Sequence, residues 1–417
     1  MKSKFKYHLL LLLIGSINLI VINYLLQLNS QQLVGNDSLN YIESAQFLYN
    51  DCKAHYYRPF VMAFITGLPL LFSNSVTYLY DFSLIVNIIS WFSTIIILFE
   101  IAKHYLVPKK AFLISLMFLF SVGNSTILFD LLSESIYLLF IIFAFYLLLQ
   151  YYKTLKFHYL SIALSLLVVS MLIRPGAKFL AILAILFFIK ILIKNIKKKS
   201  IVFFYSALFL VFMQCYAVKS TYGNFKISYI DSYTYYNYLG AKSNMLKKNE
   251  NLKDFNSKER DKYLTQFSYK EANAVAQNDF LNQLKNNFPN LILAYIDDLH
   301  HNTTDGSSRI LLSENVKKTN YFELVKTTFF YLSKIQNILL TLLGFGLSLL
   351  CVIKNYKKEK FSILVAGFIL YTILISGVSC AQGDRFHIII YPFVLILVSK
   401  FWSNRISSKP FFALLQK

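Results

Sequence analysis

The stretch Gly35–Pro59, GNDSLNYIESAQFLYNDCKAHYYRP, follows the first long apolar run of the chain. Asp37 and Ser38 are both favourable at a helix start, because their side chains accept hydrogen bonds from free backbone N–H groups. Apolar residues then recur at helical spacing: Leu39, Ile42, Ala45 and Tyr49. This pattern predicts a short amphipathic helix lying along a membrane surface. The stretch ends at Arg58-Pro59, so a carboxylate and a guanidinium share one loop beside the bilayer.

The composition of the whole chain predicts an all-α integral membrane protein. Of its 417 residues, 56% are hydrophobic and only 15% are charged, and the mean hydropathy is +0.50. The apolar residues form runs of about 20 residues, the length that spans a bilayer as a helix. The first run, residues 7–26, is long and is followed by no small-residue cleavage site. We therefore expect a retained span and not a signal peptide.

About ten transmembrane helices are expected from these runs. We place them at 7–28, 76–103, 111–122, 131–151, 158–173, 176–193, 201–219, 326–353, 361–378 and 388–402. The net charge of +21 comes largely from lysines at the ends of the runs. That placement is typical of cytoplasmic turns, so it predicts both termini inside and argues against nucleic acid as a partner.

Three regions follow from this topology. Residues 1–220 form an N-terminal transmembrane module whose first external loop, 29–59, carries the candidate catalytic residues. Residues 221–323 are polar and amphipathic, which predicts an external helical loop domain at the membrane surface. Residues 324–417 form a C-terminal transmembrane module. Two shorter predictions complete the outer face: a half-buried apolar segment at 60–72 and a small external turn at 123–130.

Ionisable side chains gather at the predicted outer membrane face, although they come from separate turns. They are Asp37, Arg58, Asp130, Glu134, Arg174, Asp384, Arg385 and His387. Charges this close to hydrocarbon are costly and mark functional sites by default. For each, a structural reading stands beside the functional one: Asp37 as a helix cap, the arginines as anchors reaching lipid headgroups, Glu134 as an interfacial acid.

The motifs at these positions resemble those of GT-C glycosyltransferases, membrane enzymes that take a sugar from a polyprenyl or dolichyl phosphate. The matching features are D-S-x-x-Y at Asp37–Tyr41 after the first span, Arg58-Pro59 before the next apolar segment, Arg174-Pro175, and Arg385-Phe386 near the last span. The chain is similar in this respect to protein O-mannosyltransferases, aminoarabinose transferases and lipopolysaccharide-core transferases. The long loop 221–323 matches no motif of these enzymes.

This resemblance implies roles for seven residues. Asp37 would be the catalytic base that deprotonates the acceptor hydroxyl, with Glu134 as a second catalytic acid that orients the acceptor or pairs with an arginine. The groups expected to bind substrate or lipid phosphate are Arg58, Arg174, Arg385, His387 and Tyr41. The implied partners are a polyprenyl-phosphate-linked sugar, a glycan, lipid-linked or protein acceptor, and the bilayer. The implied location is a bacterial inner membrane, with the site facing the periplasm or exterior.

No cofactor follows from the sequence, although Asp37 and Glu134 could share a divalent cation. The four cysteines form no C-x-x-C pair, and a disulfide between Cys52 and Cys380 stays open. Neither a G-x-G-x-x-G motif nor a P-loop is present, which argues against a soluble nucleotide-sugar donor and against ATP. The alternatives are a surface-polysaccharide polymerase or ligase that uses a pyrophosphate-linked donor, and a lipid or glycan transporter.

Overall fold

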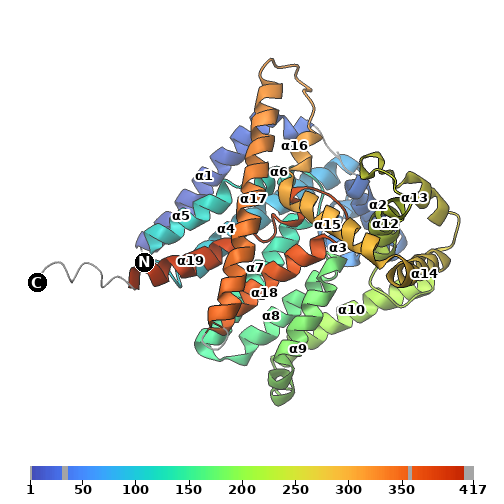
Figure 1. The fold of residues 1–417 in the computed structure, drawn as a ribbon. Helices are drawn as coiled ribbons and strands as arrows, with labels where there is room; N and C mark the ends of the chain where they lie inside the picture. The colour runs from blue at the N-terminus through green and yellow to red at the C-terminus, as the bar shows by residue number, and fades with distance from the viewer. Residues whose placement is uncertain (1, 31–35, 356–358, 408–417) are drawn as a thin grey trace, which may run out of the picture.

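The computed structural model describes residues 2–30, 36–355 and 359–407. Within these residues the regular secondary structure is helical, apart from one isolated β-bridge between Ser307 and Gly383. Gly35, the basic turn at 356–358 and the tail after residue 407 lie outside the described residues. Figure 1 shows a bundle of long helices, with the smaller helices α2 and α12–α14 gathered at the side away from the start of α1. The prediction of an all-helical membrane protein is confirmed at this level.

Six helical segments in the described ranges are long and apolar enough to cross a membrane. They belong to α1 (Lys2–Leu26), α4 (Val76–Ala102), α7 (Glu134–Thr154), α9 (Lys178–Lys194), α10 (Ile201–Tyr222) and α17 (Phe322–Asn355). Each coincides with a predicted span. At 34 residues, α17 is about 50 Å long at 1.5 Å per residue, so it extends well beyond a hydrocarbon core of about 30 Å.

The four remaining predicted spans correspond to shorter or broken helices. These are α5 (Pro108–Leu119), α8 (Phe157–Ser170), α18 (Lys360–Ser376) and α19 (Tyr391–Ser407). The predicted external turn at 123–130 is wrong as a surface turn, because residues 121–138 are all buried. There the chain bends by 64° after α5 and continues as α6 (Val122–Thr126) and a 3-10 turn.

The bundle is organised around α7 and α19. Helix α7 packs against α4, α8 and α18, and α19 packs against α4, α5, α17 and α18. Residues 388–397, which lead into α19, are buried without exception. Phe145 of α7 contacts the rings of Phe368 and Phe393 at centroid distances of 5.5 and 5.0 Å, joining three helices at the centre. This core holds α7, α18 and α19 together.

The helix predicted in the first loop is present as α2 (Asn36–Asp51), and the short helix α3 (Phe60–Thr66) follows it. The long polar segment forms a helical cap over it. Its elements are α11 (Ile230–Thr234), a π-helical turn (Tyr235–Leu239), α12 (Gly240–Lys247), α13 (Lys258–Leu264), α14 (Tyr269–Asn286), α15 (Phe288–Thr304) and α16 (Ser308–Leu311).

Aromatic rings join this cap to the first loop. Tyr56 stacks on Tyr269 with a centroid distance of 4.6 Å, and Tyr57 meets Tyr233 at 5.1 Å. The backbone N–H of Tyr229 also donates to the carbonyl of Tyr56 at 2.9 Å. Offset and edge contacts of this kind stabilise beyond the area they bury. The loop that carries Asp37 and Arg58 is therefore held from above by the cap as well as from below by the bundle.

Candidate functional site

Asp37 and Arg58 meet although 21 residues separate them. Asp37 stands in the first turn of α2, and Arg58 Nη2 donates to its Oδ1 at 2.5 Å. Tyr41, one helical turn after Asp37, lies beneath the guanidinium, with its ring centroid 4.4 Å from Arg58 Cζ. The Arg58 side chain is only 7% exposed. Asp37, Tyr41 and Arg58, which come from the two loop motifs, are therefore in direct contact.

His55 fixes the backbone that carries Arg58. Its Nδ1 accepts the N–H groups of Tyr57 and Arg58, each at 3.1 Å, while Nε2 lies 3.1 Å from Glu43 Oε2. Burial lowers the pKa of His55 to about 4, so the ring is neutral at pH 7 and Nε2 carries the proton given to Glu43. Ser44 donates to the Arg58 carbonyl at 3.3 Å. This arrangement positions Arg58 without using its guanidinium.

Arg385 joins the first loop to the N-terminal end of α7. Its Nη1 contacts Asp37 Oδ2 at 2.6 Å and its Nε contacts Glu134 Oε1 at 2.5 Å. Nη1 also donates to Gln382 Oε1 at 3.0 Å. The side chain leaves a 3-10 turn, Asp384–Phe386, whose backbone is tied to Gly306 of the cap. Three segments distant in sequence therefore meet at one guanidinium.

Arg174 completes the set at Glu134 Oε1, the same oxygen that Arg385 contacts. Its Nη1 lies 3.3 Å from Glu134 Oε1, and its Cζ sits 5.0 Å from the ring centroid of Phe386. Glu134 is 2% exposed and begins α7. We call Asp37, Arg58, Glu134, Arg174 and Arg385 the ion network. Three guanidinium groups and two carboxylates leave it with one positive charge in excess.

The electrostatics of the network favour full ionisation. Burial alone would raise the pKa of Asp37, but the charges and hydrogen bonds of Arg58 and Arg385 outweigh it and hold that pKa well below its usual range. For Arg385, burial would lower the pKa, yet Glu134 and Asp37 raise it above the ordinary value. Asp37 is 31% exposed as a side chain, whereas Glu134 is shielded. Asp37 is therefore the carboxylate of the network that a solute can reach.

His387 is the one predicted site residue that the structure places apart from the network. Its Nδ1 meets the hydroxyl of Thr341 at 3.0 Å and its Nε2 the hydroxyl of Ser376 at 3.0 Å, and the ring is fully buried. Both ring nitrogens are thus occupied between α17 and α18. We correct the expectation of phosphate contact at His387: it has a packing role in this structure.

Two further acids of the outer face also lie outside the network. Asp130 pairs with the buried Arg309 of α16 at 2.8 Å, which fastens the end of the cap to the bundle. Asp384 is 2% exposed, with Oδ2 packed against Gly123, and burial raises its pKa to about 8. At pH 7 this carboxyl is largely protonated. Asp384 is therefore not an ionised base, and Asp130 is buried in its pair with Arg309.

Sequence reasoning missed two neighbours of the network, Gln382 and Tyr238. Gln382 accepts from Arg385, as described above. Tyr238 lies in the π-helical turn of the cap; burial raises its pKa, and Cys380 and Asp37 are near enough to raise it further. A π-helical turn often marks a functional segment. The only signal for it in the sequence was the aromatic run at 233–238. The sequence gives no indication that this run lies near Asp37.

The described residues contain no group of three or more His, Cys, Asp or Glu side chains that could hold a metal ion. Both carboxylates that could share a cation, Asp37 and Glu134, already accept from Arg385. All four cysteines are free, with Cys52 exposed and Cys380 buried. No family model matches the chain, and no curated protein matches it in sequence.

Proposed function

We propose that this protein is a GT-C type glycosyltransferase that moves a sugar from a polyprenyl-phosphate donor to a glycan, lipid-linked or protein acceptor. The observation that supports this most is the ion network, in which an acid from the first loop and three arginines from separate turns converge at one end of the bundle. The proposal includes ten spans, counting the four short or broken helices, and both termini in the cytoplasm. It places the network at the outer face of a bacterial inner membrane.

The arginines supply what a lipid-phosphate leaving group requires. Negative charge develops on the phosphate oxygen as the bond to the sugar breaks, and guanidinium groups stabilise that charge with paired donors. Arg385 and Arg58 direct their N–H groups at Asp37 in this structure. The phosphate of the sugar-carrying lipid would compete with Asp37 for these N–H groups. The positive charge in excess favours the entry of one anionic group into the network.

Asp37 is the proposed base, and its pairing shapes how it acts. A carboxylate with a strongly lowered pKa is ionised but holds a proton poorly, so in the resting state it is a weak base. When the phosphate of the sugar-carrying lipid binds Arg58 and Arg385, these arginines no longer pair with Asp37. Because their charges lower the pKa of Asp37, its proton affinity then rises. Base strength in this scheme depends on a bound donor.

The proposed reaction is a single displacement. Asp37 removes the proton of the acceptor hydroxyl as that oxygen forms a bond to the anomeric carbon. The bond from this carbon to the phosphate oxygen breaks, its electron pair stays on the lipid phosphate, and the configuration at carbon inverts. Glu134 keeps Arg385 in place throughout, since it is shielded from solutes and contacts Arg385 Nε.

Contacts at mid-span argue against the transporter alternative. The notable polar residues there, Asn87 and Gln214, are 1% and 2% exposed. Asn87 donates to the carbonyls of Leu128 and Asp130, at 3.1 and 2.9 Å, and Gln214 bonds backbone groups of Phe60 and Ile227. Both side chains satisfy irregular backbone inside the bundle. Neither side chain is exposed to an open path through the bundle, although Asn87 Oδ1 is buried without a hydrogen-bond partner in the described residues.

The direct test uses the purified protein in detergent with two lipids, polyprenyl phosphate and the uncharged polyprenol of equal length. Native mass spectrometry should show retention of the phosphate and at least tenfold weaker retention of the alcohol. Arg385→Ala should remove this preference, while Lys219→Ala, an exposed lysine at the same end of the bundle, should keep it. Equal retention of both lipids by the unaltered protein would remove the phosphate site, and with it the proposal.

A further inference from the structure

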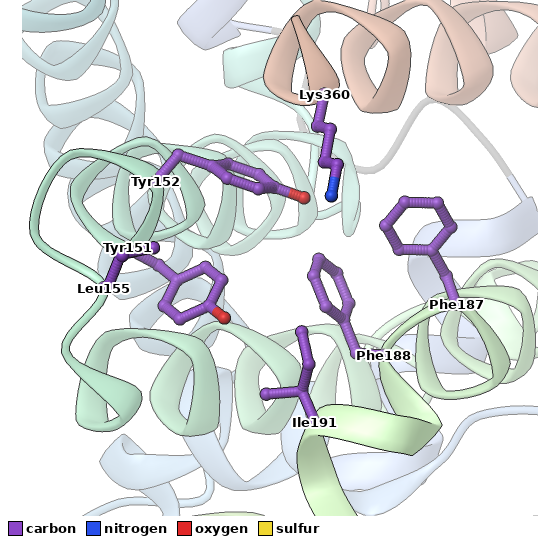
Figure 2. A pocket seen from close by; sticks show the side chains of 7 residues that line it. All are labelled: Tyr151, Tyr152, Leu155, Phe187, Phe188, Ile191 and Lys360. Atoms are coloured by element: carbon purple, nitrogen blue, oxygen red, sulfur yellow. The ribbon is translucent and has the colours of Figure 1, made fainter. Parts of the chain in front are cut away.

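A pocket of about 270 Å³ lies between α7, α9 and the start of α18, far from the ion network. It is lined by Tyr151, Tyr152, Leu155, Phe187, Phe188, Ile191 and Lys360. Figure 2 shows the amino group of Lys360 and the hydroxyl of Tyr152 directed toward one another at one side, with the rings of Phe187 and Phe188 opposite. The pocket therefore combines an apolar wall with a cationic and hydroxylic edge.

Its position along α7 puts this pocket at the other membrane face. Glu134 of the ion network begins α7, and Tyr151 and Tyr152 occupy its last turn. A helix of 21 residues is about 30 Å long, which equals the hydrocarbon thickness of a bilayer. A ligand of this pocket would come from the leaflet opposite the candidate active site.

The polar edge of the pocket has donors without protein acceptors. The Tyr152 hydroxyl is buried and has no hydrogen-bond partner in the described part of the chain. Lys360 is exposed and forms no ion pair with any described carboxylate. The neighbouring turns add positive charge through exposed lysines: Lys153, Lys156, Lys190 and Lys194. An anionic group with acceptor oxygens would satisfy both unused donors.

The apolar wall continues into the lipid-facing surface. Phe188 is buried at 2% exposure, whereas Phe187 and Leu186, next to it on α9, are 53% and 60% exposed. A ligand here therefore needs an anionic head and a hydrocarbon tail that follows α9 into the bilayer. Basic pockets between transmembrane helices hold lipid head groups through this combination of contacts.

We propose that the pocket binds an anionic glycerophospholipid of this leaflet, with its phosphate between Lys360 and Tyr152 and an acyl chain against Phe187 and Phe188. The lysine supplies a point charge and the tyrosine a directed hydrogen bond to the phosphate oxygens. The pocket would act as a structural lipid site that ties α18 to α7 and α9. This proposal is independent of the proposed transferase reaction.

The test compares phosphatidylglycerol with phosphatidylcholine on the full-length protein in detergent, by native mass spectrometry and by thermal unfolding with added lipid. Phosphatidylglycerol should bind at least tenfold more tightly and raise the melting temperature. Lys360→Ala should weaken its binding about tenfold and Tyr152→Phe about threefold, whereas Lys360→Arg should preserve it. The matched control is Lys354→Ala, an exposed lysine at the end of α17 that does not line the pocket.

Three results would overturn the proposal. One is equal binding of the two lipids by the unaltered protein. Another is unchanged phosphatidylglycerol binding in both Lys360→Ala and Tyr152→Phe. The third is full competition by soluble glycerol phosphate at equal concentration, because that would show a headgroup site without an acyl contact. Tyr152→Phe leaves the ring in place, so it keeps the test valid if Lys360→Ala fails to fold.

Discussion

Arg385 contacts Asp37 at 2.6 Å, although 348 positions of the sequence separate them. The same guanidinium contacts Glu134 at 2.5 Å. Among the ion pairs of the described residues, Arg385 is the link between the Asp37–Arg58 pair and the Glu134–Arg174 pair. The chemistry proposed for this protein depends on that link, and it can be tested from each side.

Asp37→Asn should reduce transfer by roughly 10²–10⁴-fold, the usual contribution of a general base. The amide cannot accept a proton, yet it keeps the size of the side chain. The measurement is turnover with a polyprenyl-phosphate-linked radiolabelled sugar, together with the yield of monodisperse protein. Asp51→Asn, at the exposed end of the same helix, is the control and should retain full turnover. Near-normal turnover of Asp37→Asn would exclude Asp37 as the base.

Alanine at each arginine of the network should weaken use of the donor more than use of the acceptor. A hydrogen bond to a charged group contributes about 1.5–3 kcal/mol, so a loss of about 10- to 100-fold in kcat/KM for the donor is expected. Arg385→Ala should have the largest effect because Arg385 contacts both acids. Lysine should rescue only in part, since it lacks the planar fork. Unchanged donor kinetics in all three variants would leave the arginines with a structural role, as partners of Asp37 and Glu134.

The natural cysteines offer a test of topology. Cys52 is exposed in the first loop, while Cys215, Cys351 and Cys380 are buried. A membrane-impermeant maleimide added to intact cells should therefore label the unaltered protein at Cys52. In a Cys52→Ser background, Lys258→Cys in the cap should be labelled from outside, and Lys199→Cys, in the turn before α10, only after the membrane is opened. Labelling of Lys199→Cys in intact cells would contradict the proposed orientation.

Asp384 predicts a dependence of stability on pH. Its folded pKa of about 8 is above the ordinary value of 3.8, so between these values the folded state holds a proton that the unfolded state has lost. Stability therefore falls as pH rises from about 4 to about 8, by at most about 1.4 kcal/mol per pH unit from this group. Asp384→Asn, which mimics the protonated carboxyl, should remove this fall.

The measurement is the melting temperature of both proteins in one detergent at pH 5, 6.5 and 8. The melting temperature of Asp384→Asn minus that of the unaltered protein should increase at each step upward in pH. A constant difference across the three values would show that Asp384 is ionised in the folded state. Asp130→Asn is an unsuitable control, because it removes the partner of Arg309.

Hydropathy predicted the long helices well, because run length and polar flanks determine where a chain can cross a bilayer. It failed at residues 123–130, where Asn124, Ser125 and Thr126 look like a surface turn. In the structure these side chains bond backbone carbonyls inside the bundle: Asn124 to Ile388, Ser125 to Ser121, and Thr126 to Val122. Composition does not distinguish a polar group that faces water from one that bonds a backbone carbonyl inside the bundle, either in the preceding turn or in a distant segment.

The candidate site shows the same limit. Six of the seven predicted residues meet in or beside the ion network, because their placement at outer helix ends narrows where they can lie. His387 follows Arg385 by only two residues, yet a 3-10 turn directs the two side chains to different surroundings. The pairing of particular acids with particular arginines depends on how the turns pack. That information lies in the tertiary contacts and not in any local pattern.

The β-bridge between Ser307 and Gly383 has a consequence for the order in which the protein matures. Gly383 has φ +62°, and a Cβ there would lie 2.3 Å from the carbonyl oxygen of Gly306, so the turn before Arg385 closes only against a finished cap. A nascent chain folds from its N-terminus during synthesis. It can form the Asp37–Arg58 and Glu134–Arg174 pairs early, but Arg385 joins them only after the cap and the turn that carries Arg385 have been made. A chain that ends before Arg385 therefore carries two separate ion pairs and lacks the residue that links them.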